Sequence, residues 1–275
     1  MTAPTFLAPP ADLMALQPGD SYTLSGAEGR HARVVQRLTV GQRLDLVDGD
    51  GLRLKCAVAG GNPSAAPSSK DELPCTVFER EAEPQPNPTI TLVQGLAKGD
   101  ASELAISQAV EVGADAIVPW QSEHAVVVWR ADRAAKSQAK WEQAVSRAVK
   151  QSRRAYLPPV CTVVDTLALA RQIRETIPAT PGNQATRTNT NGLALILDGD
   201  AQLSLADIPL PSAGNIMVIV GPEGGISTAE LTELTAAGAV PVTAGPHVMR
   251  SSTAGAVAIA AISLRLGRWS RWNTR

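Results

Sequence analysis

From Thr89 onward, short apolar runs alternate with longer segments whose apolar positions recur at helical spacing. The apolar runs, rich in β-branched residues, cover residues 90–93, 117–119, 193–197, 216–220 and Val240–Val242. The helical segments cover residues 100–113, 131–151 and 251–266, and Gly113 and Gly267 stop two of them. Asp100 and Glu103 have the spacing of a capping box at the start of the first segment. Alternation of this kind is typical of a parallel α/β sheet. Residues 89–275 are therefore predicted to form one α/β domain.

Residues 1–83 follow a different pattern, with short β-like segments at Ser21–Leu24, Arg43–Val47, Leu52–Val58 and 75–79. Asp48-Gly49-Asp50-Gly51, between two of these segments, is a strong hairpin signal. Residues 31–38 predict one or two helical turns that bury Val34 and Val35. The front of the chain is therefore predicted to be a small, barrel-like β domain.

Three alternating prolines, Pro84, Pro86 and Pro88, predict an extended linker over residues 84–88 that separates the two domains. Two further stretches are rich in Gly, Pro, Ser, Thr or Asn. Residues 60–70 are predicted to be a mobile loop inside the first domain, and residues 178–192 a disordered surface loop of the second.

The run at residues 216–220 leads into V-G-P-E-G-G-I-S-T-A-E, residues 220–230. Gly221, Gly224 and Gly225 predict a turn that requires a positive φ or a close backbone approach. Ser227 and Glu230 have the spacing of a capping box, so a helix is predicted to begin at Thr228. The stretch lacks the Gly-Lys-Ser/Thr of a Walker A loop and the spacing of a dinucleotide fingerprint. An ordinary strand-turn-helix joint remains the alternative to a ligand loop.

A second strand-to-helix joint follows the strand Val240–Val242, at residues 243–250. Two such joints close in sequence are expected to lie side by side at the carboxyl edge of one parallel sheet. Open α/β proteins bind ligands at this edge. The two joints together therefore predict a ligand site.

The net charge of the 275-residue chain is −1, so a nucleic-acid site would have to be a local basic patch. Cys56, Cys75 and Cys161 form no C-x-x-C pair, which predicts reduced, packed thiols and excludes a zinc set. His31, His124 and His247 make no metal set either, and no metal is expected. The N-terminal sequence and the absence of a long apolar run predict a soluble, cytoplasmic protein without a membrane span.

Basic residues recur every three, four or seven positions along the predicted helix at 131–151 and just beyond it. This basic stripe consists of Arg133, Lys136, Lys140, Arg147 and Arg154. Its two interpretations are a solvated helix face and a surface that binds RNA phosphates.

The motifs together resemble those of the SPOUT methyltransferases, and within them the bacterial 16S rRNA uridine-N3 methyltransferase (RsmE) family. The resemblance rests first on V-G-P-E-G-G-I-S at residues 220–227 and on A-G-P-H-V-M-R-S-S-T-A at 244–254. Further matches in the same order are Q-G-L-A-K-G-D at 94–100, Q-A-V-E-V-G at 108–113, P-W-Q-S-E-H at 119–124 and K-Q-S-R-R at 150–154. The resemblance covers nearly the whole chain.

The resemblance implies a PUA-like, RNA-binding β-barrel at residues 1–83 and a SPOUT α/β domain with a deep trefoil knot at 89–275. It implies S-adenosylmethionine as cofactor, 16S rRNA in the small ribosomal subunit as substrate, and a homodimer, which the apolar helix at 251–266 also favours. The implied cofactor residues are Leu197, Gly221, Pro222, Glu223, Gly224, Gly225, Ala244, Gly245, Val248, Met249 and Ser252. The implied RNA-binding residues are Arg37, Lys98, Arg133, Lys136, Lys140, Arg147, Arg153 and Arg154.

Two positions depart from the family's pattern. Family members carry an arginine near the first strand, whereas uncharged residues precede Phe6. Ser252 stands where the family has an acidic side chain, so this position cannot supply a general base.

The candidate catalytic residues are Glu223 and Arg250, the one carboxylate and the one cation in the two joints. Methylation of uracil N3 removes a proton, so a base or an anion-stabilising cation would assist it. For Glu223, hydrogen bonding to turn amides is the alternative role. For the chain as a whole, the alternatives are a non-catalytic RNA-binding module and a ribose 2′-O-methyltransferase.

Overall fold

The computed structural model describes residues 3–60, 71–177 and 192–270. The chain forms two compact units: Met1–Gln85 with Val149–Leu157, and Pro86–Ala148 with Pro158–Arg275. The division after Gln85 falls inside the linker predicted at 84–88. Residues 61–70 and 178–191 of the two predicted loops lie outside the described residues.

The first unit contains a five-stranded sheet with the strand order β1-β3-β4-β5-β2. The strands are β1 (Thr5–Leu7), β2 (Ser21–Leu24), β3 (Arg43–Val47), β4 (Leu52–Val58) and β5 (Leu73–Ala82). β1 runs parallel to β3 and the other pairs are antiparallel. The predicted hairpin joins β3 to β4, and Asp48 Oδ1 accepts hydrogen bonds from the backbone N–H groups of Asp50 and Leu52. The local hydrophobic pattern did not indicate β1, because a strand of three edge residues shows no periodicity.

Short helical segments flank this sheet: α1 (Pro10–Leu13), α2 (Gly26–Arg30) and a turn of π-helix, η1 (His31–Val35). The predicted helical turns are therefore present, but the predicted burial of Val34 and Val35 is wrong, since they are 44% and 66% exposed. Ala32 is the residue that this segment buries completely, because the wider π-turn directs a different side chain inward. The core of the unit is formed by Phe6, Leu13, Leu24, Leu44, Leu46, Leu54, Cys56, Leu73, Cys75 and Val77.

The segment Val149–Leu157 belongs to the first unit, although the sequence assigned it to the second domain. Its anchor is Arg53, only 8% exposed, which donates to the backbone O of Arg153 at 2.8 Å. The Arg53 guanidinium also pairs with Asp45 at 3.0 Å and Glu83 at 2.6 Å. A buried arginine requires such partners, because an unpaired charge would be strongly destabilising there. The sequence offers no local signal for this tertiary contact.

The second unit contains a parallel sheet of six strands in the order β11-β9-β10-β6-β7-β8. The strands are β6 (Thr89–Gly95), β7 (Ala116–Gln121), β8 (Val164–Asp165), β9 (Gly192–Leu197), β10 (Asn215–Val220) and β11 (Val240–Val242). β10 lies near the centre and is buried along almost its whole length. The predicted parallel α/β domain is therefore confirmed.

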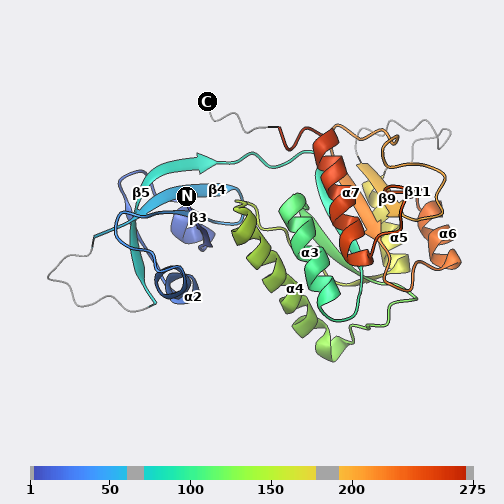
Figure 1. Ribbon diagram of the computed structural model, residues 1–275, viewed down its shortest axis with the longest axis horizontal. Coiled ribbons are helices and arrows are strands. Elements are labelled where there is room, and N and C mark those ends of the chain that lie inside the picture. The colour runs from blue at the N-terminus through green and yellow to red at the C-terminus, as the bar shows by residue number, and fades with distance from the viewer. Residues whose placement is uncertain (1–2, 61–70, 178–191, 271–275) are drawn as a thin grey trace. The chain divides into compact units, whose positions relative to one another are not determined.

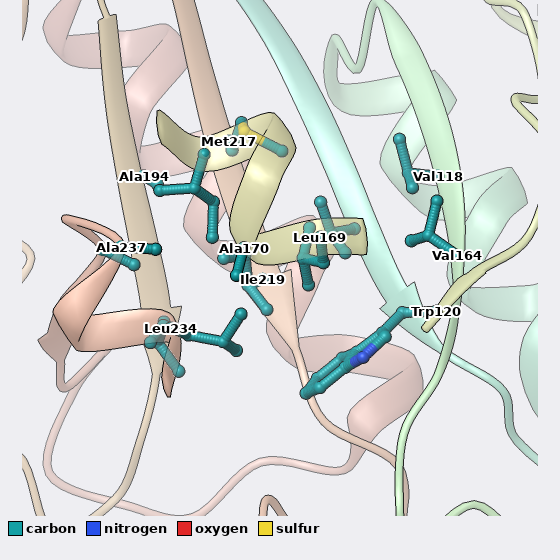
Figure 2. Close-up of a cluster of buried hydrophobic side chains, with 14 of the residues drawn as sticks. Val118, Trp120, Val164, Leu169, Ala170, Ala194, Met217, Ile219, Leu234 and Ala237 are labelled. Carbon is teal, nitrogen blue, oxygen red and sulfur yellow. The ribbon is translucent and has the colours of Figure 1, made fainter. Parts of the chain in front are cut away.

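Helices cover both faces of this sheet (Figure 1). Their bounds are α3 (Asp100–Val112), α4 (Ala131–Ser152), α5 (Thr166–Thr176), α6 (Thr228–Ala236) and α7 (Ser251–Arg265). α3 and α7 pack side by side and α7 packs on β10 and β6, while α5 and α6 pack together on the opposite face. There Trp120, Leu169, Met217, Ile219 and Leu234 form a continuous apolar core (Figure 2).

Two capping boxes were predicted, at the N-termini of α3 and α6. The box of Ser227 and Glu230 at α6 is present, with both reciprocal hydrogen bonds. The box proposed for Asp100 and Glu103 at α3 is wrong, because the cap residue is Gly99, whose φ is +65° and which has no side chain. Glu103 instead forms an ion pair with Arg147 of α4 at 2.8 Å.

The cysteine expectations are met: Cys56 and Cys75 are buried free thiols, and Cys161 is a partly buried one. Burial raises the pKa of the Cys161 thiol, which keeps it in the unreactive protonated form. Within the described residues, none of the helices has the length and apolar character needed to cross a membrane.

Candidate functional site

Three loops meet at the carboxyl edge of the parallel sheet and enclose a cavity of about 1020 Å³. They are the glycine turn (residues 221–225) after β10, the second loop (243–250) after β11, and the third loop (198–200) after β9. The sequence predicted that the first two loops would be neighbours. They do line one cavity, but β9 lies between β10 and β11 and contributes the third loop. Sheet edges of this type are where open α/β proteins bind ligands.

The glycine turn has the tight geometry expected of its sequence. Gly225 has a φ of +77°, and its N–H donates to the backbone O of Pro222 at 3.0 Å. A Cβ atom on Gly221 would come within 2.7 Å of Ile226 Cγ1. Gly95, at the end of β6, likewise leaves no room for a Cβ, because Pro222 N would be 2.6 Å away. The turn is therefore held closely against the neighbouring strand.

The second and third loops are connected through the backbone. Asp198 N–H donates to the O of Val242 at 3.0 Å, and Thr243 exchanges backbone hydrogen bonds with Leu203 and Leu205. Gly245 has a φ of +133°, which accounts for glycine at that position. Val248 lines the cavity and is 94% exposed, so its apolar side chain is accessible to solvent.

Ten of the eleven residues predicted to bind a cofactor line this cavity. They are Leu197, Gly221, Pro222, Glu223, Gly225, Ala244, Gly245, Val248, Met249 and Ser252. Gly224 is the exception, because it faces His124 instead of the cavity. Its φ does not lie in the positive region, so the expectation of a positive φ holds for Gly225 and not for Gly224.

The cavity also has lining residues that the sequence did not indicate. These are Ala101 and Leu104 of α3, Asp198, Gly199 and Asp200 of the third loop, and Thr228 and Leu231 of α6. The signal available for the third loop was L-D-G-D at residues 197–200, which follows a strand as the other two loops do. The α3 residues carried no such signal, since helix packing alone brings them to the cavity.

Three carboxylates, Asp198, Asp200 and Glu223, line the cavity together with Arg250. Glu223 is the one carboxylate of the two predicted loops, and the third loop adds Asp198 and Asp200 to the lining of the cavity. Arg250 is the only arginine or lysine among the described lining residues, and it precedes the first turn of α7. The cavity therefore carries an excess of negative charge, which favours a ligand with positive charge.

Glu223 is exposed, and within the described residues its carboxylate makes no hydrogen bond to a turn amide. The carboxylate that does so is Glu230, which accepts a hydrogen bond from the N–H of Ser227 at 3.1 Å. The structural role considered for Glu223 therefore belongs to Glu230, which the sequence identified only as a helix cap.

The predicted RNA-binding residues divide into exposed and engaged groups. Arg37, Lys98, Lys136, Lys140 and Arg153 are exposed. Arg147 is exposed but paired with Glu103, Arg154 is partly buried, and the side chain of Arg133 lies outside the described residues. Two arginines in the C-terminal part of the chain make contacts within the second unit. Arg265 donates to the backbone O atoms of Leu205 and Ile208, and Arg268 forms an ion pair with Asp115 at 2.7 Å.

The three histidines lie in separate surroundings. His31 makes an edge-to-face contact with Phe6, His124 approaches Gly224, and His247 lines the cavity. In the part of the chain that the structure describes, no three His, Cys, Asp or Glu side chains are grouped to hold a metal ion.

The geometry describes an α/β domain with a glycine-lined cavity at the carboxyl edge of its sheet, and residues 83–263 match the RNA methyltransferase domain family. A Mycobacterium bovis protein named ribosomal RNA small subunit methyltransferase E is 39% identical over 91% of this chain and 89% of its own length. The Bacillus subtilis protein of the same name is 27% identical over 90% and 91%. This chain belongs to the ribosomal RNA small subunit methyltransferase E family.

A solved structure agrees with this assignment. The Neisseria gonorrhoeae ribosomal RNA small subunit methyltransferase E, crystallised with bound S-adenosyl methionine, superposes with a TM-score of 0.75. It is 28% identical, and the match covers 96% of this chain and 98% of that one.

Proposed function

We propose that this protein transfers a methyl group from S-adenosylmethionine to N3 of a uridine in 16S rRNA of the small ribosomal subunit. The observation that carries the proposal is the cavity at the carboxyl edge of the sheet, lined by ten of the predicted cofactor residues. Membership of the family and the cofactor bound to the Neisseria gonorrhoeae relative support it.

The cavity suits the chemistry of S-adenosylmethionine. Leu197, Val220, Ile226 and Met249 offer apolar walls for an adenine, and the glycine turn exposes backbone groups to its edge. Asp198, Asp200 and Glu223 match the positive charges of the sulfonium and the ammonium groups. When bound, S-adenosylmethionine supplies an electrophilic methyl group, and no metal is required for its transfer.

The chain's own residues then have to orient the acceptor and manage its proton. Arg250, at the mouth of the cavity, stabilises the negative charge that develops on the uracil as the N3 proton leaves. Glu223 is exposed in the same cavity and can accept that proton. Ser252 lines the cavity but has no basic group, so it contributes shape and hydrogen bonding only.

The first unit is proposed to be the PUA-like barrel that holds the RNA, with Arg37 and Arg153 as exposed contacts. In the second unit, Lys98, Lys136 and Lys140 supply further phosphate contacts. The alternative for the basic stripe is a solvated helix face.

The proposal also includes a cytoplasmic homodimer and a trefoil knot that contains the glycine turn and the second loop. Support for the dimer comes from three exposed apolar side chains on the neighbouring helices α3 and α7: Leu104, Val257 and Leu264, which are 50%, 40% and 65% exposed. The apolar character of α7, however, does not by itself indicate a partner subunit. Most of the apolar surface of α7 is buried by α3 and the sheet of the same chain.

The test is mass mapping of modified nucleosides in 16S rRNA from cells that lack the protein, followed by treatment with purified protein and S-adenosylmethionine. Loss and restoration of 3-methyluridine at one position are expected. Restoration of a ribose 2′-O-methyl group would assign the reaction to the ribose. RNA binding without any methylation would support the non-catalytic module.

A further inference from the structure

The segment that follows β7 lies directly against the glycine turn of the cavity. His124 Nδ1 is 3.0 Å from the backbone O of Gly224. A carbonyl oxygen only accepts hydrogen bonds, so Nδ1 must carry a hydrogen for this contact to be a bond. Neither His124 nor Gly224 lines the cavity, so the bond holds the side of the turn that faces away from the cavity.

The fit between the two residues depends on the missing side chain of Gly224. A Cβ atom there would come within 2.9 Å of His124 Cβ and 3.0 Å of the His124 backbone O. The histidine backbone and the turn therefore pack without any intervening group.

A second connection between the same two segments runs through Glu230, which is 5% exposed. Its Oε1 accepts from the N–H of Glu123 and from Thr166 Oγ1, both at 2.8 Å. Its Oε2 accepts from the N–H of Ser227, which follows the turn, at 3.1 Å. One buried carboxylate thus joins the segment after β7, the start of α5 and the end of the glycine turn.

The Glu230 network is anchored in the core of the unit. Trp120 Nε1 donates to Thr166 Oγ1 at 3.2 Å, and the Trp120 ring is completely buried beside Val164 and Leu169 (Figure 2). A hydrogen-bonded network fixed to a packed core restricts the positions that its members can adopt.

We propose that His124 and Glu230 are positioning residues that clamp the glycine turn in the conformation that binds the cofactor. The inference rests on the proposed function. The clamped turn contributes Glu223 and Gly225 to the lining of the cavity, whereas His124 and Glu230 do not line it. A turn that is ordered before binding does not have to be ordered by the ligand, which raises affinity.

The test compares His124→Ala with His124→Asn, because the side-chain N–H of asparagine takes nearly the place of Nδ1–H. His124→Ala should weaken S-adenosylmethionine binding in calorimetry by about five-fold, the value of one net hydrogen bond. Its cofactor KM should rise by the same factor at an unchanged kcat, as expected for uniform binding. His124→Asn should restore most of the affinity. Because the His124 side chain is exposed, the unfolding temperature of either variant should fall by no more than about 2–4 °C.

Glu230→Gln provides the second arm, with Glu233→Gln as its matched control on α6. Glu233 pairs with Arg174 at the surface and lies outside the clamp. Glu230→Gln should weaken cofactor binding more than ten-fold, because an amide N–H would face the N–H of Ser227 or of Glu123. Glu233→Gln should bind as the parent does.

Each outcome decides between the two proposals. A parent protein that does not bind S-adenosylmethionine would refute the proposed function and this inference with it. A parent that binds, together with a His124→Ala variant of equal affinity and KM, would refute the clamp alone. Equal loss in His124→Ala and His124→Asn would also refute it, since the hydrogen bond would then be irrelevant.

Discussion

Gly224 lies so close to His124 that a Cβ atom on the glycine would be 2.9 Å from the histidine Cβ. Real Cβ contacts are essentially never this short, so any side chain at position 224 displaces the turn or the segment after β7. The requirement for glycine here is one of space between two segments, and the backbone conformation of Gly224 itself is ordinary.

Gly224→Val should therefore abolish S-adenosylmethionine binding by moving the glycine turn. The matched control is Gly238→Ala, which follows α6 outside the cavity, where a Cβ meets only Ile177 Cδ1 at 4.0 Å but the φ of +110° is strained. The control should lose about 1 kcal/mol of stability and keep most of its affinity. Calorimetry on both variants checks this, and tight binding by Gly224→Val would contradict the placement of the turn.

Arg250→Gln should lower kcat by about a hundred-fold, because a cation that stabilises developing charge contributes mainly in the transition state. Arg250→Lys keeps the charge but not the planar donor geometry, and we expect an intermediate rate. Single-turnover methylation of rRNA measures both. Neither variant should change RNA affinity, and a loss of RNA binding with an unchanged rate would reassign Arg250 to RNA contact.

The RNA surface can be tested at Lys136 and Lys140, which are exposed on α4. Arg147 is left intact because its pair with Glu103 would complicate the interpretation. The Lys136→Gln, Lys140→Gln double variant should reduce the salt slope of RNA binding by about two units. Arg171→Gln, an exposed change on α5, is the control and should have no effect. A parental slope in the double variant would favour the solvated-face interpretation.

A dimer interface over α3 and α7 predicts that Leu264→Asp, alone or with Val257→Asp, produces a monomer. Both side chains are exposed apolar groups in this chain, so the monomer should stay folded. Light scattering at micromolar concentration measures the mass of each variant. The control is Leu203→Asp, which changes an exposed leucine outside α3 and α7. A monomeric parent protein would refute the proposed dimer.

Arg53→Ala should destabilise the first unit by about 3 kcal/mol, because it leaves Asp45 and Glu83 as partly buried carboxylates without their partner. Arg80→Ala, an exposed arginine on β5, should change stability by less than about 0.5 kcal/mol. Amide hydrogen exchange resolves the two units, and protection should fall in β3, β4 and β5. All five tryptophans occur at or after Trp120, so their fluorescence reports on the second unit. Unfolding followed by this fluorescence should not shift.

Local patterns in the sequence determined most of the elements. The apolar run of β10, the hairpin between β3 and β4, the box of Ser227 and Glu230, and the end of α3 at Gly113 all depend on neighbouring residues. Short-range sterics and hydrogen bonds decide such features, so periodicity and turn chemistry suffice to predict them. Two local predictions were wrong. The cap residue of α3 is Gly99 and not Asp100, and Val34 and Val35 in the π-turn η1 are exposed and not buried.

The motifs further predicted that two loops would lie together at one edge of the sheet, because each glycine-rich joint follows a parallel strand, and both loops line the cavity. Only the tertiary structure decided what else joins them. β9 inserts between β10 and β11 and brings Asp198 and Asp200, and helix packing brings Leu104. It also decided that Gly224 faces His124 and that Glu230, not Glu223, holds the turn. The contacts of His124 with Gly224 and of Glu123 with Glu230 join residues about a hundred positions apart. Packing in the folded chain determines these two contacts, so no local pattern could reveal them.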